Sequence, residues 1–516
     1  MMRRPLSVSL SLLLGGLVTY PLLRFLLLPL WPALGPSVIA PMGQGPGLGE
    51  AAATSVLLAA AAAACAVPPS VWLGTLIERR RWRGRSLLLG AMLMLFLMPG
   101  YLVAAGWQIV AGSEPVGALP WLRDALLGWP GLIFLLALKS LPVATLAVAL
   151  GWTVGQPRLE EAARLHVANR WHRWRLIVRP IGPAAATAFL IVFVEAMHDY
   201  GLASTVGARL HLKLLVTEVY ASLAAWPISW TRAAEAGDLL IAVSLAPLLL
   251  RVLLGSRSIP PLDRALAPMT RPASRGEAVA GGITCGLLFA AGSFVPLLAL
   301  AVDAFSPEAA AVPAEAWASL GRSALYSFVG ALGAVGLACA VLAATTGERW
   351  QTAFMWLPLG NLAVPGIVLG AADVIAFNGP PLPMIGTPLA LLLAQIATQF
   401  PLLALFLRAP MRAQTGRLGD AARVHGIGVL DRVERLYLPP LVRPLAWAGA
   451  LAFGRLFFEL PLAQMLAPAG GEPVGVALVQ LQQGLRFAAE ARLALAAVLV
   501  CGAVVSVVLV AAERAQ

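Results

Sequence analysis

Three acidic side chains interrupt long apolar stretches of the sequence, where a charged group is costly and is usually kept for a function. Glu195 and Asp199 lie in the apolar run at about 184–206, and Glu459 lies in a later run. One hypothesis is that these carboxylates line a translocation path that tolerates a cation, or close its outer end. The alternative is that Asp199 and Glu459 lie at the outer membrane interface, solvated or paired with arginine. A separate hypothesis pairs Lys139 with an acid of the run at 184–206. The sequence leaves these hypotheses open.

Two polar, arginine-rich islands repeat one short pattern between apolar runs. The first island contains Glu161, Ala162, Ala163, Val167, Ile177 and Pro180, and the second contains Asp420, Ala421, Ala422, Gly426, Leu436, Leu438 and Pro439. Small side chains let a helix seat closely in a groove of another protein. An acid at the start of a helix is stabilised by the helix dipole and can pair with a basic residue of a partner. An ordinary connecting loop would explain one copy, but two matching copies favour docking segments.

Other kinds of site are not supported by the sequence. It contains no Gly-x-x-x-x-Gly-Lys-Ser/Thr phosphate loop, so we do not expect the chain itself to bind ATP in the usual manner. The four cysteines, Cys65, Cys285, Cys339 and Cys501, lie in apolar stretches without metal-ligand spacing and are expected to be packing residues. We therefore predict a protein without a catalytic set, a metal site or a cofactor of its own.

The composition is that of a membrane protein with many spans. Hydrophobic residues make up 59% and charged residues 12%, and the mean hydropathy is +0.82. Soluble domains carry roughly 25% charged residues. The apolar runs are long enough to cross a bilayer as helices and lack the alternation of a barrel strand. The net charge of +12 comes from arginines in short loops, which indicates membrane orientation rather than nucleic-acid binding.

We expect an all-α polytopic protein with about twelve transmembrane helices. The expected ranges are 7–31, 51–76, 87–110, 131–153, 184–206, 233–254, 281–304, 321–346, 352–377, 387–407, 444–466 and 490–512. The arginine-rich loops all fall on the side of Arg3 and Arg4, which predicts that both termini and both islands are cytoplasmic in the inner (plasma) membrane. The outer segments 207–232 and 467–489 are partly apolar, so we expect them to dip into the membrane or to form short surface helices.

The two halves of the chain look like parallel repeats. Pro142 precedes Glu161 by the same number of residues as Pro401 precedes Asp420. We therefore predict two six-helix halves joined by a cytoplasmic linker rich in Pro, Arg and Ser. The predicted bounds are 1–254 for the first half (core about 51–254), 255–280 for the linker and 281–516 for the second half (core about 321–512).

These features resemble the permeases of binding-protein-dependent ABC importers. That family carries a cytoplasmic loop, the EAA motif, with the pattern Glu-Ala-Ala, three residues, Gly, nine residues, Ile, one residue, Leu-Pro. The second island fits this pattern well, whereas the first has Val167 for Gly and Arg179 for Leu. Four further runs resemble the iron(III), thiamine and aminoethylphosphonate subfamily: Pro99-Gly100-Tyr101, Asp199-Tyr200-Gly201, Val364-Pro365-Gly366-Ile367-Val368-Leu369 and Glu459-Leu460-Pro461.

The resemblance implies a type-1 permease fold and a set of partners. The two islands would be coupling loops for two copies of an ATP-binding subunit, which would hold ATP and Mg at the cytoplasmic face. A periplasmic or surface-bound substrate-binding protein would deliver ferric iron or a similar small solute, such as thiamine or a phosphonate. The alternative is a twelve-helix secondary carrier driven by an ion gradient, in which the intramembrane acids would couple to protons or sodium.

The unequal islands lead to a first prediction, that the second tolerates change less well than the first. Exchanging the two differing residues tests it. Gly426→Val should lower uptake, because a branched side chain blocks the close approach that glycine permits, whereas Val167→Gly should have little effect. Uptake by cells with equal amounts of each variant in the membrane measures the difference. Equal losses in both variants would contradict the prediction.

Overall fold

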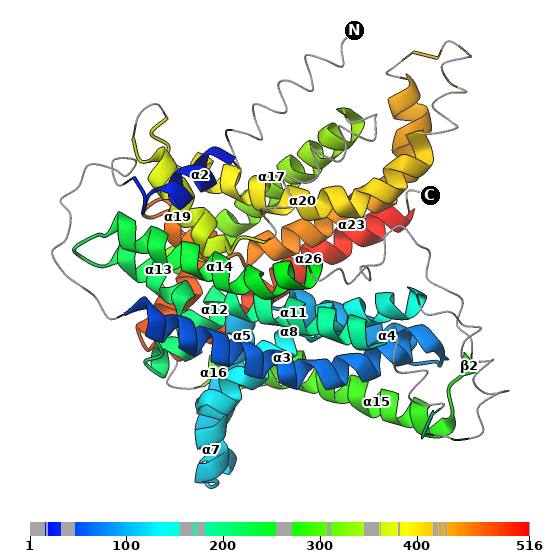
Figure 1. Cartoon of the computed structure of the whole chain (residues 1–516), viewed down its shortest axis with the longest axis horizontal. Coiled ribbons are helices and arrows are strands. Elements are labelled where there is room, and N and C mark those ends of the chain that lie inside the picture. Colours follow the sequence, from blue (N-terminus) through cyan, green and yellow to red (C-terminus); the bar gives the residue numbers. More distant parts are fainter. Residues whose placement is uncertain are drawn as a thin grey trace. The chain divides into compact units, whose positions relative to one another are not determined.

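The computed structural model describes residues 19–31, 47–154, 181–253, 271–306, 311–344, 363–379, 382–415 and 431–514, with a few isolated positions between them. These residues are almost entirely helical (Figure 1). The strands among them are β1 (Arg80–Arg81) and β2 (Arg271–Pro272), which pair in parallel. The expected all-α membrane fold is therefore confirmed.

The helices follow one another with few long connections in the described ranges. Those before residue 255 are α2 (Tyr20–Leu27), α3 (Leu48–Arg79), α4 (Arg85–Leu97), α5 (Gly100–Gly112), α6 (Glu114–Gly117), α7 (Pro120–Leu127), α8 (Trp129–Val154), α11 (Ile181–Met197), α12 (Tyr200–Leu202), the π-helix η3 (Ala203–Gly207), α13 (Leu215–Ala224) and α14 (Trp230–Leu253). Those after it are α15 (Arg275–Phe289), the π-helix η4 (Ala290–Phe294), α16 (Val295–Ala304), α17 (Ala314–Ala344), α19 (Gly366–Phe377), α20 (Pro388–Thr415), the π-helix η5 (Arg432–Tyr437), α23 (Leu438–Phe457), α24 (Pro461–Leu466), α25 (Val474–Gln483) and α26 (Phe487–Arg514).

Within the described residues, seven helices are long and apolar enough to cross a membrane, or nine if each of two bent pairs is one span. Each of the twelve expected ranges overlaps a helix. Three ranges predicted as single spans are broken, however, and one of them is 444–466, which is interrupted between α23 and α24. The range 87–110 bends by 95° between α4 and α5, and the range 184–206 bends by 48° after α11. The first break follows from Pro99, which has no N–H to continue α4 and disfavours helical backbone at Met98.

The helices form two compact units. Unit one contains Met1–Gly43, Val219–Asp238 and Asp303–Gln516, and unit two contains Gln44–Glu218 and Leu239–Val302. The first helical segment of each half thus belongs to the unit of the other half: α2 packs against α19, and α15 packs against α4. The division of the sequence into halves at 255–280 stays a prediction.

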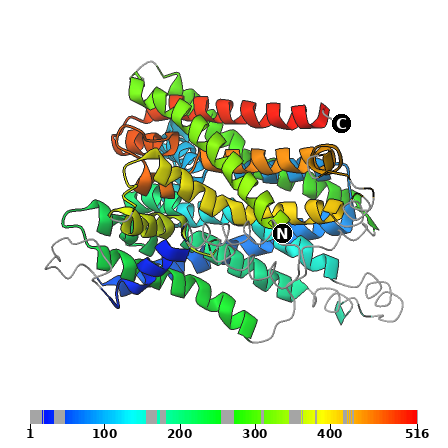
Figure 2. The ribbon, with the colours of Figure 1, turned by 90° about the horizontal axis from the view of Figure 1, so that it is seen from above.

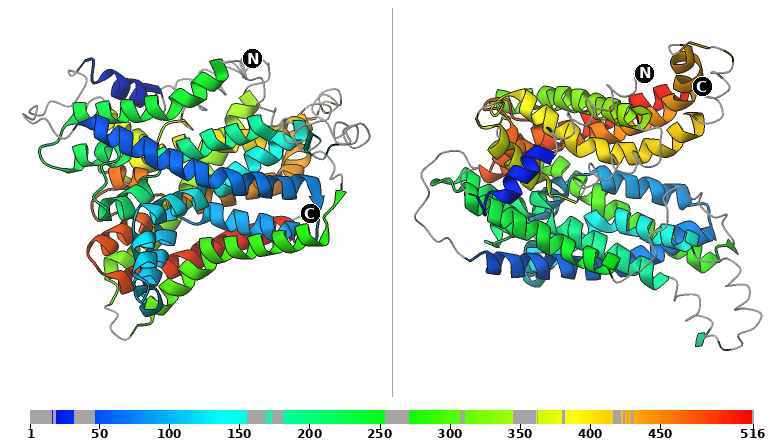
Figure 3. Two further views of the ribbon diagram at one scale, coloured as in Figure 1. Left: turned by 60° about the horizontal axis from the view of Figure 1, so that its bottom comes forward. Right: turned by 45° about the horizontal axis from the view of Figure 1, so that its top comes forward.

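Unit two is built on α3, which lies beside α8 and α11 (Figure 1). At one end of the unit, buried Leu76, Leu88 and Met92 form an apolar cluster against which Cys285 of α15 packs. The long helices α3 (blue) and α15 (green) reach this same end, where β1 pairs with β2 (Figure 3). The pairing fixes the beginning of α15 to the end of α3.

Unit one has α17 packed on α20 and α23, and α26 (red) lies beside α23 (orange) in Figure 2. The α2 segment is held on α19 by a polar and an aromatic contact. Arg24 Nη1 donates to the carbonyl oxygen of Ala376 at 3.1 Å, and the rings of Tyr20 and Phe377 lie 6.4 Å apart. An arginine within an apolar segment is thereby satisfied by the free carbonyl near the end of another helix.

The segments 207–232 and 467–489 contain the short helices α13 and α25, many of whose side chains are buried; whether they dip into the membrane stays a prediction. The first residue of each short helix donates its N–H to a serine of a long helix. Ser55 Oγ of α3 accepts the N–H of Leu215 at 3.0 Å, and Ser323 Oγ of α17 accepts the N–H of Val474 at 2.7 Å. A helix start leaves N–H groups without a partner, and here a neighbouring helix supplies the acceptor.

Packing of α16 on α5 gives a prediction for stability. A Cβ added at Gly106 would lie 2.4 Å from the Cα of Pro296, whereas one at Gly90 of α4 would meet nothing within 4 Å. Gly106→Ala should therefore lower the free energy of unfolding by about 1–3 kcal/mol through overpacking. Gly90→Ala should be neutral or slightly stabilising, because alanine favours a helix. Unfolding in detergent measures both variants, and equal stability of the two would refute this packing.

Candidate functional site: capped helix breaks

In unit two, the two broken spans touch each other at their breaks. A Cβ on Gly100, at the start of α5, would lie 3.3 Å from Leu202 Cγ. A Cβ on Gly201, in α12, would lie 3.3 Å from Tyr101 Cδ1. Glycine at both positions lets α5 and α12 approach closely. These glycines belong to the Pro99-Gly100-Tyr101 and Asp199-Tyr200-Gly201 runs that the sequence analysis singled out.

Asp199 holds the second break through both of its carboxylate oxygens. Oδ1 accepts the N–H of Leu202 at 2.9 Å and so caps α12. Oδ2 accepts from Lys139 Nζ of α8 at 2.5 Å, and the aspartate side chain is 3% exposed against 37% for the lysine. The predicted pairing of Lys139 with an acid of this span is confirmed. Asp199 thus ties α8 to the point where α11 ends and α12 begins.

Unit one contains a corresponding pair of helix starts. Helix α19 begins after Pro365, and α24 begins after Glu459 and Leu460. A Cβ on Gly366 would lie 3.3 Å from Pro461 Cβ, and one on Gly370 would lie 3.0 Å from Met465 Cβ. The Pro-Gly start of α19 therefore packs on the start of α24, as α5 packs on α12 in unit two.

Glu459 performs the same capping task as Asp199. Its Oε1 accepts the N–H of Leu462 at 2.7 Å, and its Oε2 accepts the N–H of Ala463 at 2.9 Å. No ion pair to Glu459 is found among the side chains that the structure describes. The start of a helix leaves N–H groups without a helical partner, and the two carboxylates accept hydrogen bonds from them here.

Capping gives Asp199 and Glu459 a structural task that neither sequence hypothesis included. A lining or gating role for these residues and for Glu195 stays a prediction. Glu195, one helical turn before Asp199 on α11, is exposed. The sequence could have indicated helix caps, because each acid directly precedes a short apolar segment. The helix breaks were missed because the surrounding sequence is apolar on both sides of each acid.

The first coupling island, with Glu161, Ala162, Ala163, Val167, Ile177 and Pro180, lies outside the described residues. So do Asp420, Ala421 and Gly426 of the second island. Of the rest of the second island, Ala422 is buried, Leu436 is half-buried, and Leu438 and Pro439 are exposed. The Ala422 carbonyl accepts the N–H of Ile427 at 3.0 Å. The coupling role of both islands remains a prediction.

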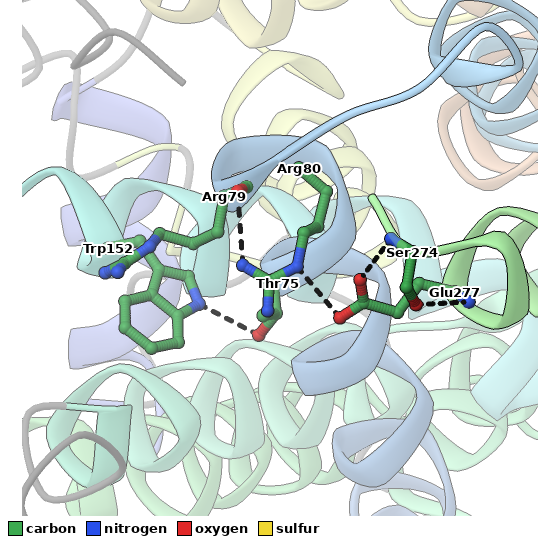
Figure 4. A network of polar contacts seen from close by, with 6 residues as sticks. All are labelled: Thr75, Arg79, Arg80, Trp152, Ser274 and Glu277. Carbon is green, nitrogen blue, oxygen red and sulfur yellow. Dashed lines mark hydrogen bonds and ion pairs between the residues drawn. The ribbon is translucent and has the colours of Figure 1, made fainter. Parts of the chain in front are cut away.

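A polar network joins three helices near the end of α8, the last described helix before the first island in the sequence (Figure 4). Trp152 lies near the end of α8; its Nε1 donates to Thr75 Oγ1 of α3 at 2.9 Å, and the guanidinium of Arg79 lies 4.6 Å from its ring centre. Arg80 Nε donates to Glu277 Oε1 of α15 at 2.9 Å. The network therefore holds the ends of α3, α8 and α15 together.

The same network stabilises the start of α15. Ser274 Oγ accepts the N–H of Glu277 at 3.2 Å, and Glu277 Oε2 accepts the N–H of Ser274 at 2.8 Å. This reciprocal arrangement is a capping box, and the Ser-x-x-Glu spacing could have predicted it. The partner Arg80 could not have been predicted, because it is far from Glu277 in the sequence.

Long apolar helices, together with two bent pairs of helices, are those of a polytopic membrane protein. Residues 70–257 match the family described as the binding-protein-dependent transport system inner membrane component. This range contains both breaks of unit two, the first island and the ion pair. Residues 70–257 are thus similar to this family of permeases, as the resemblance in the sequence implied.

Relatives of the chain include ferric and thiamine permeases. A ferric transport system permease protein of Haemophilus influenzae is 22% identical over 60% of this chain and 49% of its own length. Another, of Actinobacillus pleuropneumoniae, is 22% identical over 54% and 40%. A thiamine transport system permease protein of Salmonella typhimurium is 27% identical over 75% of each chain. The chain thus aligns with about half or less of each ferric relative, and no solved structure matches it.

The ion pair at the first break gives a prediction. Lys139→Met leaves the buried carboxylate of Asp199 without its cation and should destabilise unit two by up to about 3 kcal/mol, the low end for a buried pair because the lysine is partly exposed. The double variant Lys139→Met with Asp199→Asn should regain most of this, because asparagine still caps a helix. The free energy of unfolding in detergent is measured for the parent protein, the single variant and the double variant.

Thr398→Met, at the position of α20 that corresponds to Lys139, is the matched control and should change stability little. If the double variant is as unstable as Lys139→Met, the loss does not come from an unpaired carboxylate.

Proposed function

We propose that the chain is the transmembrane permease subunit of an ATP-driven importer and forms its translocation path. The observation that carries this proposal is the family match over residues 70–257, which includes the first polar island as well as the paired breaks. The family is described as binding-protein-dependent, and a binding protein is the component that distinguishes such an importer from a secondary carrier.

The substrate class in this proposal is ferric iron or a similar small solute, such as thiamine or a phosphonate. Support comes from the relatives, which are named as ferric and thiamine permeases. The chain is proposed to lie in the inner membrane with both termini in the cytoplasm, since its arginine-rich loops fall on one side.

The partners in this proposal are two copies of an ATP-binding subunit and a periplasmic or surface-bound substrate-binding protein. ATP and Mg would be bound by the ATP-binding subunits, which dock on the two islands. Their closure would move the first island. Because Trp152 at the end of α8 is hydrogen bonded to α3, and α3 is tied to α15 through Arg80 and Glu277, these three helices would move as one body.

The capped breaks suit this movement. A helix break is a point at which a span can bend, and its capping carboxylate keeps the N–H groups satisfied while it does so. In unit two the Lys139–Asp199 pair links such a point to α8, the helix that leads into the first island. Movement of that island would therefore reach the break through a single helix.

Purification with the natural partners tests the proposal. An ATP-binding subunit should co-purify with the chain, and its ATP hydrolysis should rise when the loaded binding protein is added. Purification of the chain without such a subunit, together with uptake by membranes that lack one, would support the secondary carrier instead.

Charge reversal at the second island tests the coupling role. Asp420→Arg should uncouple ATP hydrolysis from uptake, because the acid can no longer pair with a basic residue of the ATP-binding subunit, while the protein still inserts. The matched control Glu434→Arg reverses a charge of the same loop at a position that the motif leaves unspecified and should transport normally. Uptake and hydrolysis are measured together, and normal uptake by Asp420→Arg would show that the coupling assignment is wrong.

A further inference from the structure

Three exposed arginines of unit two lie together where the end of α3 meets the start of α15. Arg81 belongs to β1, Arg83 lies in the turn that follows it, and Arg275 is the first residue of α15. β1 pairs with β2, and Ala273 donates its N–H to the carbonyl oxygen of Arg81 at 3.0 Å, which brings the two segments together. The ion pairs between described residues include none of these three side chains, which we call the arginine cluster.

The arginine cluster is held in place by its neighbours. Arg80 Nε donates to Glu277 Oε1 of α15 at 2.9 Å, and Figure 4 shows this pair beside Ser274. Trp82 packs on the same helix, because a Cβ added at Gly281 would lie 3.2 Å from its ring. Glu277 Oε2 accepts the N–H of Ser274, so both oxygens of this acid are already engaged by other groups. The cluster therefore presents positive charge from a fixed position.

An apolar stripe runs along α15 from Arg275. Val279, Ile283 and Leu287 follow that arginine at intervals of four residues, which places all of them on one face of the helix. These three side chains, which we call the apolar stripe, are 56–63% exposed. The opposite face of α15 is the packed one, since Cys285 lies there against the apolar cluster of unit two. The stripe is thus the outer face of α15 in this unit.

Helix α4, which packs on α15, also exposes apolar side chains next to the arginine cluster. Leu87 follows Arg83 by four residues and is 71% exposed, and Met94 lies about two turns further on and is 51% exposed. Helix α15 itself begins a stretch, Arg275–Ala304, that is long and apolar enough to cross a membrane. A surface of this kind faces lipid, so the arginines at its end lie at the depth of the lipid head groups.

An anionic phospholipid matches both features at once. The planar guanidinium group can donate two parallel hydrogen bonds to a phosphate, and basic residues at the end of a membrane helix attract anionic lipids. The acyl chains of the same molecule would cover the apolar stripe. An acidic protein surface or a free phosphate ion would match the arginines but would leave the stripe without an apolar partner.

We propose that the arginine cluster binds the head group of an anionic phospholipid whose acyl chains lie along the apolar stripe of α15. The bound lipid holds the junction of α3 and α15 at the membrane surface, next to the pair formed by Arg80 and Glu277. This site goes beyond the proposed function, because it does not depend on which solute the chain carries or on what drives uptake.

Native mass spectrometry of the purified full chain in detergent tests this site. The probe is phosphatidylglycerol, which is anionic, and the comparison is phosphatidylcholine, which carries no net charge. The cluster variant combines Arg81→Gln, Arg83→Gln and Arg275→Gln. It should bind phosphatidylglycerol at least about tenfold more weakly than the parent chain, since each arginine near a membrane surface contributes about fivefold to binding. Its binding of phosphatidylcholine should not change, which shows that the variant is folded.

A matched control removes three exposed arginines elsewhere in the chain, by Arg123→Gln, Arg209→Gln and Arg486→Gln. This control has the same net charge as the cluster variant and should bind phosphatidylglycerol like the parent chain. Ile283→Ser leaves every arginine in place and should weaken binding of phosphatidylglycerol at least about threefold, because it removes part of the apolar contact.

Equal losses in the cluster variant and in the control would show an effect of net charge alone and would overturn the proposal. Unchanged binding by the cluster variant would overturn it as well, and so would displacement of the lipid by excess inorganic phosphate. Pull-down with the ATP-binding subunit covers the remaining alternative. A cluster variant that loses this subunit but keeps the lipid would assign the arginines to a protein partner and overturn the lipid site.

Discussion

Backbone N–H groups that lose their helical partners inside a membrane are the constraint on which this structure depends. Spans break after Pro99 and at Asp199, and α24 starts afresh after Glu459. Because lipid offers no hydrogen bonds, each restart needs an acceptor from the chain itself. A carboxylate supplies it at Asp199 and at Glu459, and glycine next to proline lets the restarted helices approach each other.

The two halves meet this constraint in different ways, which gives the duplication its asymmetry. In unit two the capping carboxylate also pairs with Lys139, so that break is tied to α8. At the corresponding place on α20, Thr398 donates to the carbonyl of Gln395 in its own helix. Glu459 instead uses both oxygens on the backbone of α24. The two polar islands also differ from each other, because the first has Val167 at the position where the second has Gly426.

The sequence predicted the membrane class, the helical ranges and the residue runs around both breaks, because hydropathy and short motifs are local properties. It also predicted that Lys139 pairs with an acid, since a lone charge in an apolar run needs a partner. It did not predict that the ranges 87–110 and 184–206 are broken, because their hydropathy is continuous through Pro99 and Asp199. Contacts such as Ser55 with Leu215, or Arg80 with Glu277, depend on tertiary packing that no local pattern reports.

The energy source of uptake tests the central claim most directly. The chain is reconstituted in vesicles with its ATP-binding subunit inside and the loaded binding protein outside, and uptake is followed with either ATP or an ion gradient as the only driving force. The account predicts uptake with ATP and the binding protein, and none with the gradient alone. Uptake driven by the gradient in vesicles that lack the ATP-binding subunit would contradict it.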